Sequence, residues 1–142
     1  MGKVRDILNY KGNNVYSVEP SMMVYHAVER MCEKNIGALL IVDNGRLVGI
    51  FTERDYARKL ILKGKSSKTT PISELMTQNP ITVTPEHTVD ECMTLMTGRF
   101  IRHLPVMEHG ELVGLISIGD VVKLTIEEQK DIIEYLENYI SR

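Results

Sequence analysis

The chain has 142 residues, of which 43% are hydrophobic and 25% charged, and it carries a formal net charge of −2 at pH 7. A chain of this length can bury a hydrophobic core and is usually one domain. The small net charge gives no basic surface, which argues against nucleic acid as the principal partner, and the longest apolar run, Ala38 to Val42, is too short to span a membrane.

The first half of the chain alternates helical and extended patterns. In chain order we expect a short helix, a strand, a helix, the two strands of a hairpin and another helix: Lys3 to Asn9, Val15 to Val18, Val24 to Cys32, Leu39 to Val42, Leu47 to Phe51 and Thr52 to Leu62. The second helix is predicted from apolar residues at helical spacing and ends at Asn35. The sequence Asp43-Asn44-Gly45 is typical of a tight hairpin turn.

The second half repeats this order after a polar linker from Gly64 to Thr70. The predicted elements are Ile72 to Met76, Ile81 to Val83, Val89 to Met96, Leu104 to Met107, Leu112 to Ile116 and a helix that begins at Ser117. Thr88 and Glu91 form the pattern of a capping box. A final amphipathic helix is expected from Ile126 to Ile140, and its apolar face needs a partner surface.

Cys32 and Cys92 each lie on an apolar helical stripe. We expect thiols packed in a core rather than a disulfide or a redox pair. No apolar segment follows Lys3 and Arg5, so no signal peptide is expected. These features favour a reduced, cytoplasmic location.

One stretch of sequence occurs twice. Gly45 to Asp55 returns at Gly110 to Asp120, 65 positions later and without a gap. Both copies contain Leu-Val-Gly, then a hydroxyl residue (Thr52 or Ser117) and, three positions on, an aspartate (Asp55 or Asp120). An internal repeat of this kind fixes the architecture. We expect an α+β fold of two β-α-β-β-α units, with their sheets packed together about a pseudo-two-fold axis and helices outside. The boundaries would be 1–65, 66–125 and, for the last helix, 126–142.

This pattern resembles the CBS-domain pair, or Bateman module, of the stand-alone bacterial or archaeal type. The likeness is carried by the repeat, by Ile36 to Val42 with its twin Ile101 to Val106, and by the Gly-x-x-Thr/Ser-x-x-Asp endings. The resemblance implies a regulatory module without catalytic activity or catalytic cofactor. It also implies that adenine nucleotides bind in clefts between the repeats.

The two endings suit this chemistry. Thr52 and Ser117 lie at predicted helix N-termini, where backbone N–H groups and the helix dipole attract anions. In the family, the aspartate one turn on accepts both ribose hydroxyls, a role that falls on Asp55 and Asp120. The same residues also match ordinary capping boxes, in which the carboxylate bonds its own helix N-terminus. Gly49 and Gly114 would permit either close backbone approach or close packing.

The resemblance assigns further residues to two clefts. The first cleft would combine Thr52, Arg54 and Asp55 with Ile81, Thr82, Val83, Arg102, His103 and Leu104. The second would combine Ser117 and Asp120 with Val15, Tyr16, Ser17, Ile36, Gly37 and Ala38. Because arginine is suited to phosphate, we expect a phosphorylated adenosine in the first cleft: AMP as first choice, with ATP, ADP, NAD or S-adenosylmethionine possible. The second would bind more weakly or prefer an uncharged adenosyl group.

Other interpretations stay open at this point. Arg54 and Arg102 could be solvated surface charges, and His103 a packed core residue. The four histidines lack ligand spacing, so no metal site is expected, and no nucleophile motif indicates an enzyme. We expect a flat homodimer through the helices Val24–Cys32 and Val89–Met96, with the C-terminal helix adding contacts. This dimer would signal to an unknown effector protein. The alternatives are a structural interaction protein with empty clefts and an enzyme, such as a nucleotide hydrolase, with an unrecognised site.

Overall fold

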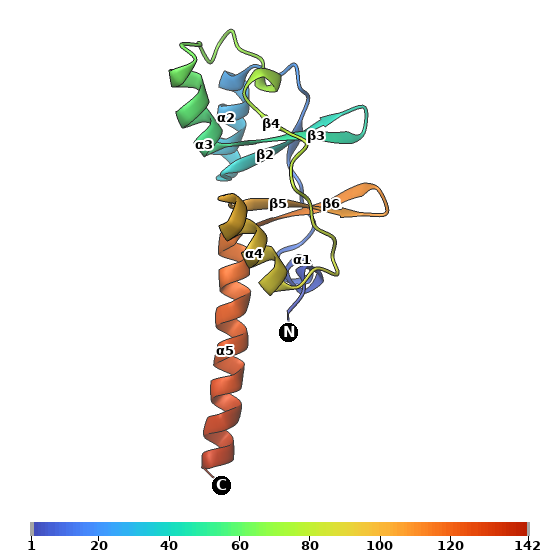
Figure 1. Cartoon of the computed structure of the whole chain (residues 1–142), viewed down its shortest axis with the longest axis vertical. Coiled ribbons are helices and arrows are strands. Elements are labelled where there is room, and N and C mark those ends of the chain that lie inside the picture. Colours follow the sequence, from blue (N-terminus) through green and yellow to red (C-terminus); the bar gives the residue numbers. More distant parts are fainter. Residues whose placement is uncertain (1, 142) are drawn as a thin grey trace. The chain divides into compact units, whose positions relative to one another are not determined.

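The computed structural model describes residues 2–141, which fold into two compact units (Figure 1). The central unit is Val15–Ile81. The terminal unit joins the first 14 residues to the segment that begins at Thr82. The fold is mixed α and β with two sheets, as predicted. Within residues 2–141, no helix combines the length and apolarity needed to cross a bilayer.

The central unit is built on a four-stranded sheet in the order β1-β2-β3-β4. Strands β1 and β2 are parallel, and the other pairs are antiparallel. The strands are β1 (Ser17–Val18), β2 (Ala38–Asp43), β3 (Arg46–Thr52) and β4 (Thr77–Gln78). The helical segments are α2 (Val24–Lys34), α3 (Glu53–Asp55), the π-helical η1 (Tyr56–Leu60) and the 3₁₀ turn η2 (Ile72–Glu74).

The tight hairpin turn predicted in the central unit is confirmed, and the terminal unit repeats it. Asn44 and Gly45 both have positive φ, at 50° and 79°, and His109 and Gly110 repeat this at 53° and 79°. Two successive left-handed residues are the signature of the type I′ turn, whose twist matches that of the flanking strands.

Helix α2 buries its apolar stripe against the sheet of its own unit. Val24, Ala27 and Met31 join a core cluster with residues of β2 and β3, including Leu39 and Phe51. The linker between the repeats lies against the start of this helix, since the Val24 N–H donates to the Thr70 carbonyl at 2.9 Å. The segment between the repeats therefore satisfies backbone donors at a helix start.

The terminal unit contains a two-stranded antiparallel sheet and three helices. These are α1 (Val4–Lys11), α4 (Val89–Arg99), β5 (His103–Glu108), β6 (Glu111–Ser117) and α5 (Ile118–Ile140). The C-terminal prediction of two helices was wrong in one respect: α5 is continuous for 23 residues from the Ser117 cap.

The predicted strand Ile81 to Val83 was also wrong. Only Val83 pairs, as a single parallel bridge to Val106. Its N–H donates to the Pro105 carbonyl and its carbonyl accepts from Met107. Pro80 and Pro85 bracket this segment and have no N–H to extend a ladder. Strand β4, which was not predicted, pairs with β3 just before them.

Two lead-in segments are exchanged between the repeats. Helix α1 packs in the terminal unit, with the second copy of the repeat, whereas η2 belongs to the central unit. A Cβ built on Gly114 would meet Leu8 Cδ2 at 2.6 Å, and one on Gly49 would meet Met76 Sδ at 2.5 Å. Both glycines therefore provide room for a lead-in side chain. This grouping differs from the proposed boundary after residue 65, because α1 finds its core in the later repeat.

Candidate functional site

In the central unit, β3 places Thr52 at the start of the next helix. The Thr52 side chain accepts from the Asp55 N–H at 3.1 Å, and Asp55 Oδ2 accepts from the Thr52 N–H at 3.0 Å. The Thr52 hydroxyl also donates to Asp55 Oδ2. Asp55 is only 8% exposed. The capping-box alternative is therefore realised in this copy.

The terminal unit repeats this geometry at the end of β6. Asp120 Oδ2 accepts from the Ser117 N–H at 2.8 Å, and the Asp120 N–H donates to Ser117 Oγ at 3.2 Å. In both copies the bond to the cap amide uses the same oxygen, Oδ2. A capping carboxylate keeps further lone pairs, so the cap is compatible with a second acceptor role.

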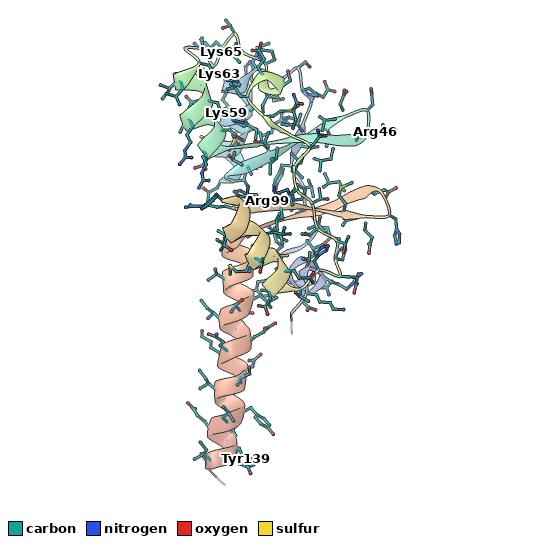
Figure 2. The ribbon with its side chains drawn as sticks, in the orientation of Figure 1. Arg46, Lys59, Lys63, Lys65, Arg99 and Tyr139 are labelled. Carbon is teal, nitrogen blue, oxygen red and sulfur yellow. The ribbon has the colours of Figure 1, made fainter. Side chains whose placement is uncertain are left out.

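Each carboxylate also meets a lysine that the sequence analysis did not single out. Lys59 Nζ lies 3.1 Å from Asp55 Oδ1 and donates to the Leu75 carbonyl at 3.1 Å. Lys11 Nζ lies 2.8 Å from Asp120 Oδ2 and donates to the Leu115 carbonyl at 2.8 Å. Figure 2 shows Lys59 on the helical segment after β3.

These lysines come from different places in the two copies. Lys59 lies four residues after Asp55 on the same helix, a spacing that favours an ion pair and could have indicated it. Lys11 comes from the last turn of α1, and 109 positions separate it from Asp120. No local pattern relates two residues so far apart. We name the two clusters the central half-site (Thr52, Asp55, Lys59) and the terminal half-site (Ser117, Asp120, Lys11).

Charge in the terminal half-site is set by burial and by Lys11. Burial raises the pKa of Asp120, but the hydrogen bonds from Lys11 and the Ser117 amide outweigh it and the net pKa is lowered. His103 pairs with Ser117 across the β5–β6 ladder. Burial lowers the pKa of His103, the charges of Lys11 and Arg102 lower it further, and Asp120 opposes them. Asp120 is therefore ionised and His103 neutral at pH 7.

The structure brings together some predicted residues that were assigned to different clefts. In the central unit, Ala38 lies opposite Thr52 in the β2–β3 ladder, and the Gly37 carbonyl accepts from the Glu53 N–H at 3.1 Å. In the terminal unit, the Arg102 carbonyl accepts from the Ile118 N–H at 2.9 Å, next to the Ser117 cap. Each half-site thus lies beside the first strand of its own hairpin, β2 or β5.

The other predicted residues divide between the same two units. Those of the central unit are Val15, Tyr16, Ser17, Ile36, Arg54 and Ile81, and those of the terminal unit are Thr82, Val83 and Leu104. The Tyr16 carbonyl accepts from the Leu40 N–H at 3.2 Å, and Lys34 Nζ lies 5.5 Å from the Tyr16 ring centroid. Leu104 and Val83 are buried, with 0% and 1% of their surface exposed.

The central unit also carries surface hollows outside its half-site. One of about 640 Å³ is lined by Ser17, by the turn that follows and by α2 side chains that include His26 and Arg30. A second of about 760 Å³ extends from Ser17 to the β2–β3 turn. Neither hollow is lined by Thr52 or Asp55.

The cysteines behave differently from each other. Burial, with the charge of Glu91 adding to it, raises the pKa of Cys92 to about 11, as expected for a packed thiol. The prediction was wrong for Cys32, which is exposed because it lies beside, rather than on, the buried stripe of α2. Among residues 2–141, no group of three or more His, Cys, Asp or Glu side chains could hold a metal ion.

Comparison with known proteins agrees with this architecture. The family model described as "CBS domain" matches twice, over residues 4–62 and 72–127. The chain is 46% identical over 122 residues to the CBS domain-containing protein CBSX3, mitochondrial, of Arabidopsis thaliana. That match covers 82% of this chain, which spans only 59% of the length of CBSX3.

Solved structures show the same fold. A putative signal-transduction protein with CBS domains from Burkholderia ambifaria is 50% identical, with a TM-score of 0.87, and the match covers 89% of this chain and 96% of that one. The CBS domain pair of protein MJ0100, solved with 5′-methylthioadenosine and S-adenosyl-L-methionine, is 29% identical with a TM-score of 0.79, covering 90% of this chain and 98% of that one. The chain therefore belongs to the CBS-domain family and carries two copies of the domain in tandem.

Proposed function

We propose that the protein is a non-catalytic regulatory module that binds an adenosyl ligand, with AMP as first choice, and passes the ligand state to an effector protein. The observation that carries the proposal is the duplicated half-site, a capped helix N-terminus with a carboxylate and a lysine in each unit. The adenosyl ligands of the MJ0100 pair support this ligand class. As the resemblance predicts, each ligand would be shared between the two repeats.

The half-site chemistry suits a nucleoside with a phosphate. The ribose hydroxyls would donate to Asp55 or Asp120, taking the place of the lysine ammonium at that carboxylate. The released lysine, with its three donors, could then bind a phosphate oxygen. The backbone N–H groups at the helix start would add to the binding of an anion.

The two half-sites differ in the side chains of their first helical turn, so we propose different ligands for them. The central half-site has Arg54 in its first helical turn, where the terminal half-site has Gly119. His103 beside the terminal half-site is neutral, because burial lowers its pKa. A phosphorylated ligand would prefer the central half-site, and the terminal half-site would bind more weakly or take an uncharged adenosyl group. ATP, ADP, NAD and S-adenosylmethionine are the other ligands to test.

Thermal unfolding with each ligand tests the proposal. A ligand at 100 times its dissociation constant stabilises the folded state by about 2.7 kcal/mol, which raises the Tm by about 2–4 °C or more for a chain of this size. Asp55→Ala should abolish the shift with AMP. Since this change also removes a helix cap, at a cost of about 1 kcal/mol, the shift is measured against each variant's own Tm.

The chain supplies a matched control. Thr88 and Glu91 form a third capping box, at the start of α4 and outside both half-sites. Glu91→Ala should lower the Tm to a similar extent and leave the AMP shift intact. No shift with any adenosyl compound would instead favour the alternative, a structural interaction dimer without a ligand. An equal loss of the shift in both variants would show that Asp55 acts through general stability and not as a ligand contact.

We also propose that the protein forms a homodimer in the cytoplasm. The stripe residues of α2 and α4 are buried within their own units, including Met31 and Met96. A dimer through these helices would therefore use their remaining, more polar faces. Ligand would bias the dimer only by its differential affinity for the two shapes.

A further inference from the structure

The distal half of α5 lies outside the matched family region, which ends at residue 127. Residues 131–141 are all exposed, so no other described part of the chain covers this end of the helix. Figure 1 shows α5 extending well past α4 and α1 of the same unit. Figure 2 shows Tyr139 projecting near its far end. Isolated helices shorter than about 12–15 residues are marginal in water, so the uncovered end of α5 would gain stability if its apolar residues were packed.

Five of the exposed apolar residues of α5 follow a heptad pattern, whereas the exposed Ile132, Tyr135 and Tyr139 lie on a neighbouring stripe of the helix. Positions in alternating steps of four and three residues are occupied by Val122, Ile126, Gln129, Ile133, Leu136 and Ile140. The five apolar members of this set, which we name the α5 seam together with Gln129, are between 41% and 79% exposed. A strict 3.5-residue repeat is the pattern of a coiled coil, narrower than the stripe of a helix that packs on a globular core.

The seam is not the face with which α5 contacts its own unit. Val121 is fully buried, and Leu124, Thr125 and Glu128 are partly buried on the same side. With about 100° of rotation per residue, the centre of the seam is about a quarter turn away from that packed side. The seam is therefore open along about 28 Å of helix, at 1.5 Å per residue from Val122 to Ile140.

The residue types in the seam point to a second copy of this chain. Ile126, Ile133 and Ile140 occupy the a positions, and Val122 and Leu136 occupy d positions. β-branched residues at a with leucine at d favour two parallel strands. We propose that two chains associate through the α5 seam as a parallel, two-stranded coiled coil.

Gln129 fixes the direction of the pair. It occupies the remaining d position, and in a parallel pair it meets its own copy, to which its amide can both donate and accept. In an antiparallel pair a positions face d positions, which would bury this amide against an isoleucine without a partner, at a cost in stability. The polar seam residue therefore favours the parallel register.

The charge of α5 argues against a membrane as the occupant. The helix carries six acidic side chains and two lysines. Helices that lie on membranes are rich in basic residues and are attracted by anionic lipids. An acidic helix is repelled by such a surface, whereas a coiled coil tolerates charges on its outer positions.

Sedimentation or light scattering of the 142-residue chain, without nucleotide, tests the seam. The expected mass is twice the chain mass of 16.2 kDa. Ile133→Asp with Leu136→Asp should raise the dimer dissociation constant by roughly 100-fold or more, because charges would be buried in the seam. Tyr135→Asp with Asn138→Asp, on the opposite side of the same turns, adds equal charge and should leave the dimer unchanged.

Cross-linking tests the direction. In a Cys32→Ser background, Leu136→Cys should form a covalent dimer with itself on oxidation, because only a parallel pair places two d positions together. Cross-linking of Leu136→Cys chains only when they are mixed with Ile126→Cys or Ile133→Cys chains would overturn the parallel register. A monomer at all concentrations, or an assembly of any size that the seam charges leave unaffected, such as a dimer held through α2 and α4 alone, would overturn the proposal. Ligand binding plays no part in these measurements, so they stand or fall apart from the proposed nucleotide site.

Discussion

Lys11 Nζ lies 2.8 Å from Asp120 Oδ2, although 109 positions separate the two residues in the chain. The contact joins the last turn of α1 to the first turn of α5. It ties the beginning of the chain to the carboxylate of the terminal half-site. Both side chains are partly buried, which protects the pair from full screening by solvent.

Removing this lysine should weaken the docking of α1 at neutral pH and make the stability of the fold less dependent on pH below about pH 4. Lys11→Met should lower the free energy of unfolding at pH 7 by about 1 kcal/mol. The pKa of Asp120 is lowered in the folded state, so its contribution to stability is present above the ordinary pKa of 3.8 and is lost as pH falls through the folded pKa. Denaturant unfolding at pH 7 and below pH 4 measures both effects. Lys130→Met, on the exposed part of α5, should change neither.

Gly114 should not tolerate a methyl group. Gly114→Ala would bring its Cβ to 2.6 Å from Leu8 Cδ2, and we expect a loss of about 1–3 kcal/mol of unfolding free energy from overpacking. Gly98→Ala is the matched control, since nothing lies within 4 Å of a Cβ there. In the last turn of α4 that change should stabilise the protein by up to about 0.5–1 kcal/mol. A Leu8→Ala partner substitution should recover part of the Gly114→Ala loss, and additivity of the two would contradict the contact.

His103 should make stability fall on mild acidification. Its folded pKa lies below the ordinary histidine pKa of 6.5, mainly through burial, so the unfolded chain binds the proton more readily. The free energy of unfolding should therefore be fully retained above pH 6.5 and should decrease as pH falls from there toward the folded value. His103→Gln should flatten this slope between pH 7.5 and 5.5. An unchanged slope in equilibrium unfolding would show that the imidazole titrates equally in both states.

The two thiols should differ in reactivity. Cys32 is exposed, whereas Cys92 is buried with its pKa raised to about 11. Because the thiolate is the reactive form, iodoacetamide at pH 8 should modify Cys32 much faster than Cys92 in the native protein. Peptide mass spectrometry over time measures the ratio, and denaturant should remove the difference. Rapid native labelling of Cys92 would mean that the α4 core opens more often than its burial indicates.

Local patterns in the sequence were sufficient for most elements. The turn at Asn44 and Gly45, the cap at Thr88 and the helix end at Asn35 were all predicted correctly, because each depends on a few adjacent residues. The internal repeat also identified the family. The wrong predictions concerned short extended segments. The bridge at Val83 and the short strand β4 depend on which strand lies alongside, and the adjacent residues do not reveal this.

The candidate site was predicted in part. Thr52, Asp55, Ser117 and Asp120 occur as a visible motif, and the structure places each pair at a helix start. Lys59 was recoverable from its i, i+4 spacing. The assignment of residues to shared clefts stays a prediction.

The sequence by itself determined the repeat, the helix caps, the hairpin turns and the family, because these depend on periodicity and on neighbours within a few positions. Tertiary structure alone decided that α1 packs with the later repeat, that Gly114 makes room for Leu8, and that Lys11 reaches Asp120. The physical reason is that burial and ion pairing between distant segments depend on how the whole chain folds back on itself. The spacing of neighbouring residues carries no information about that.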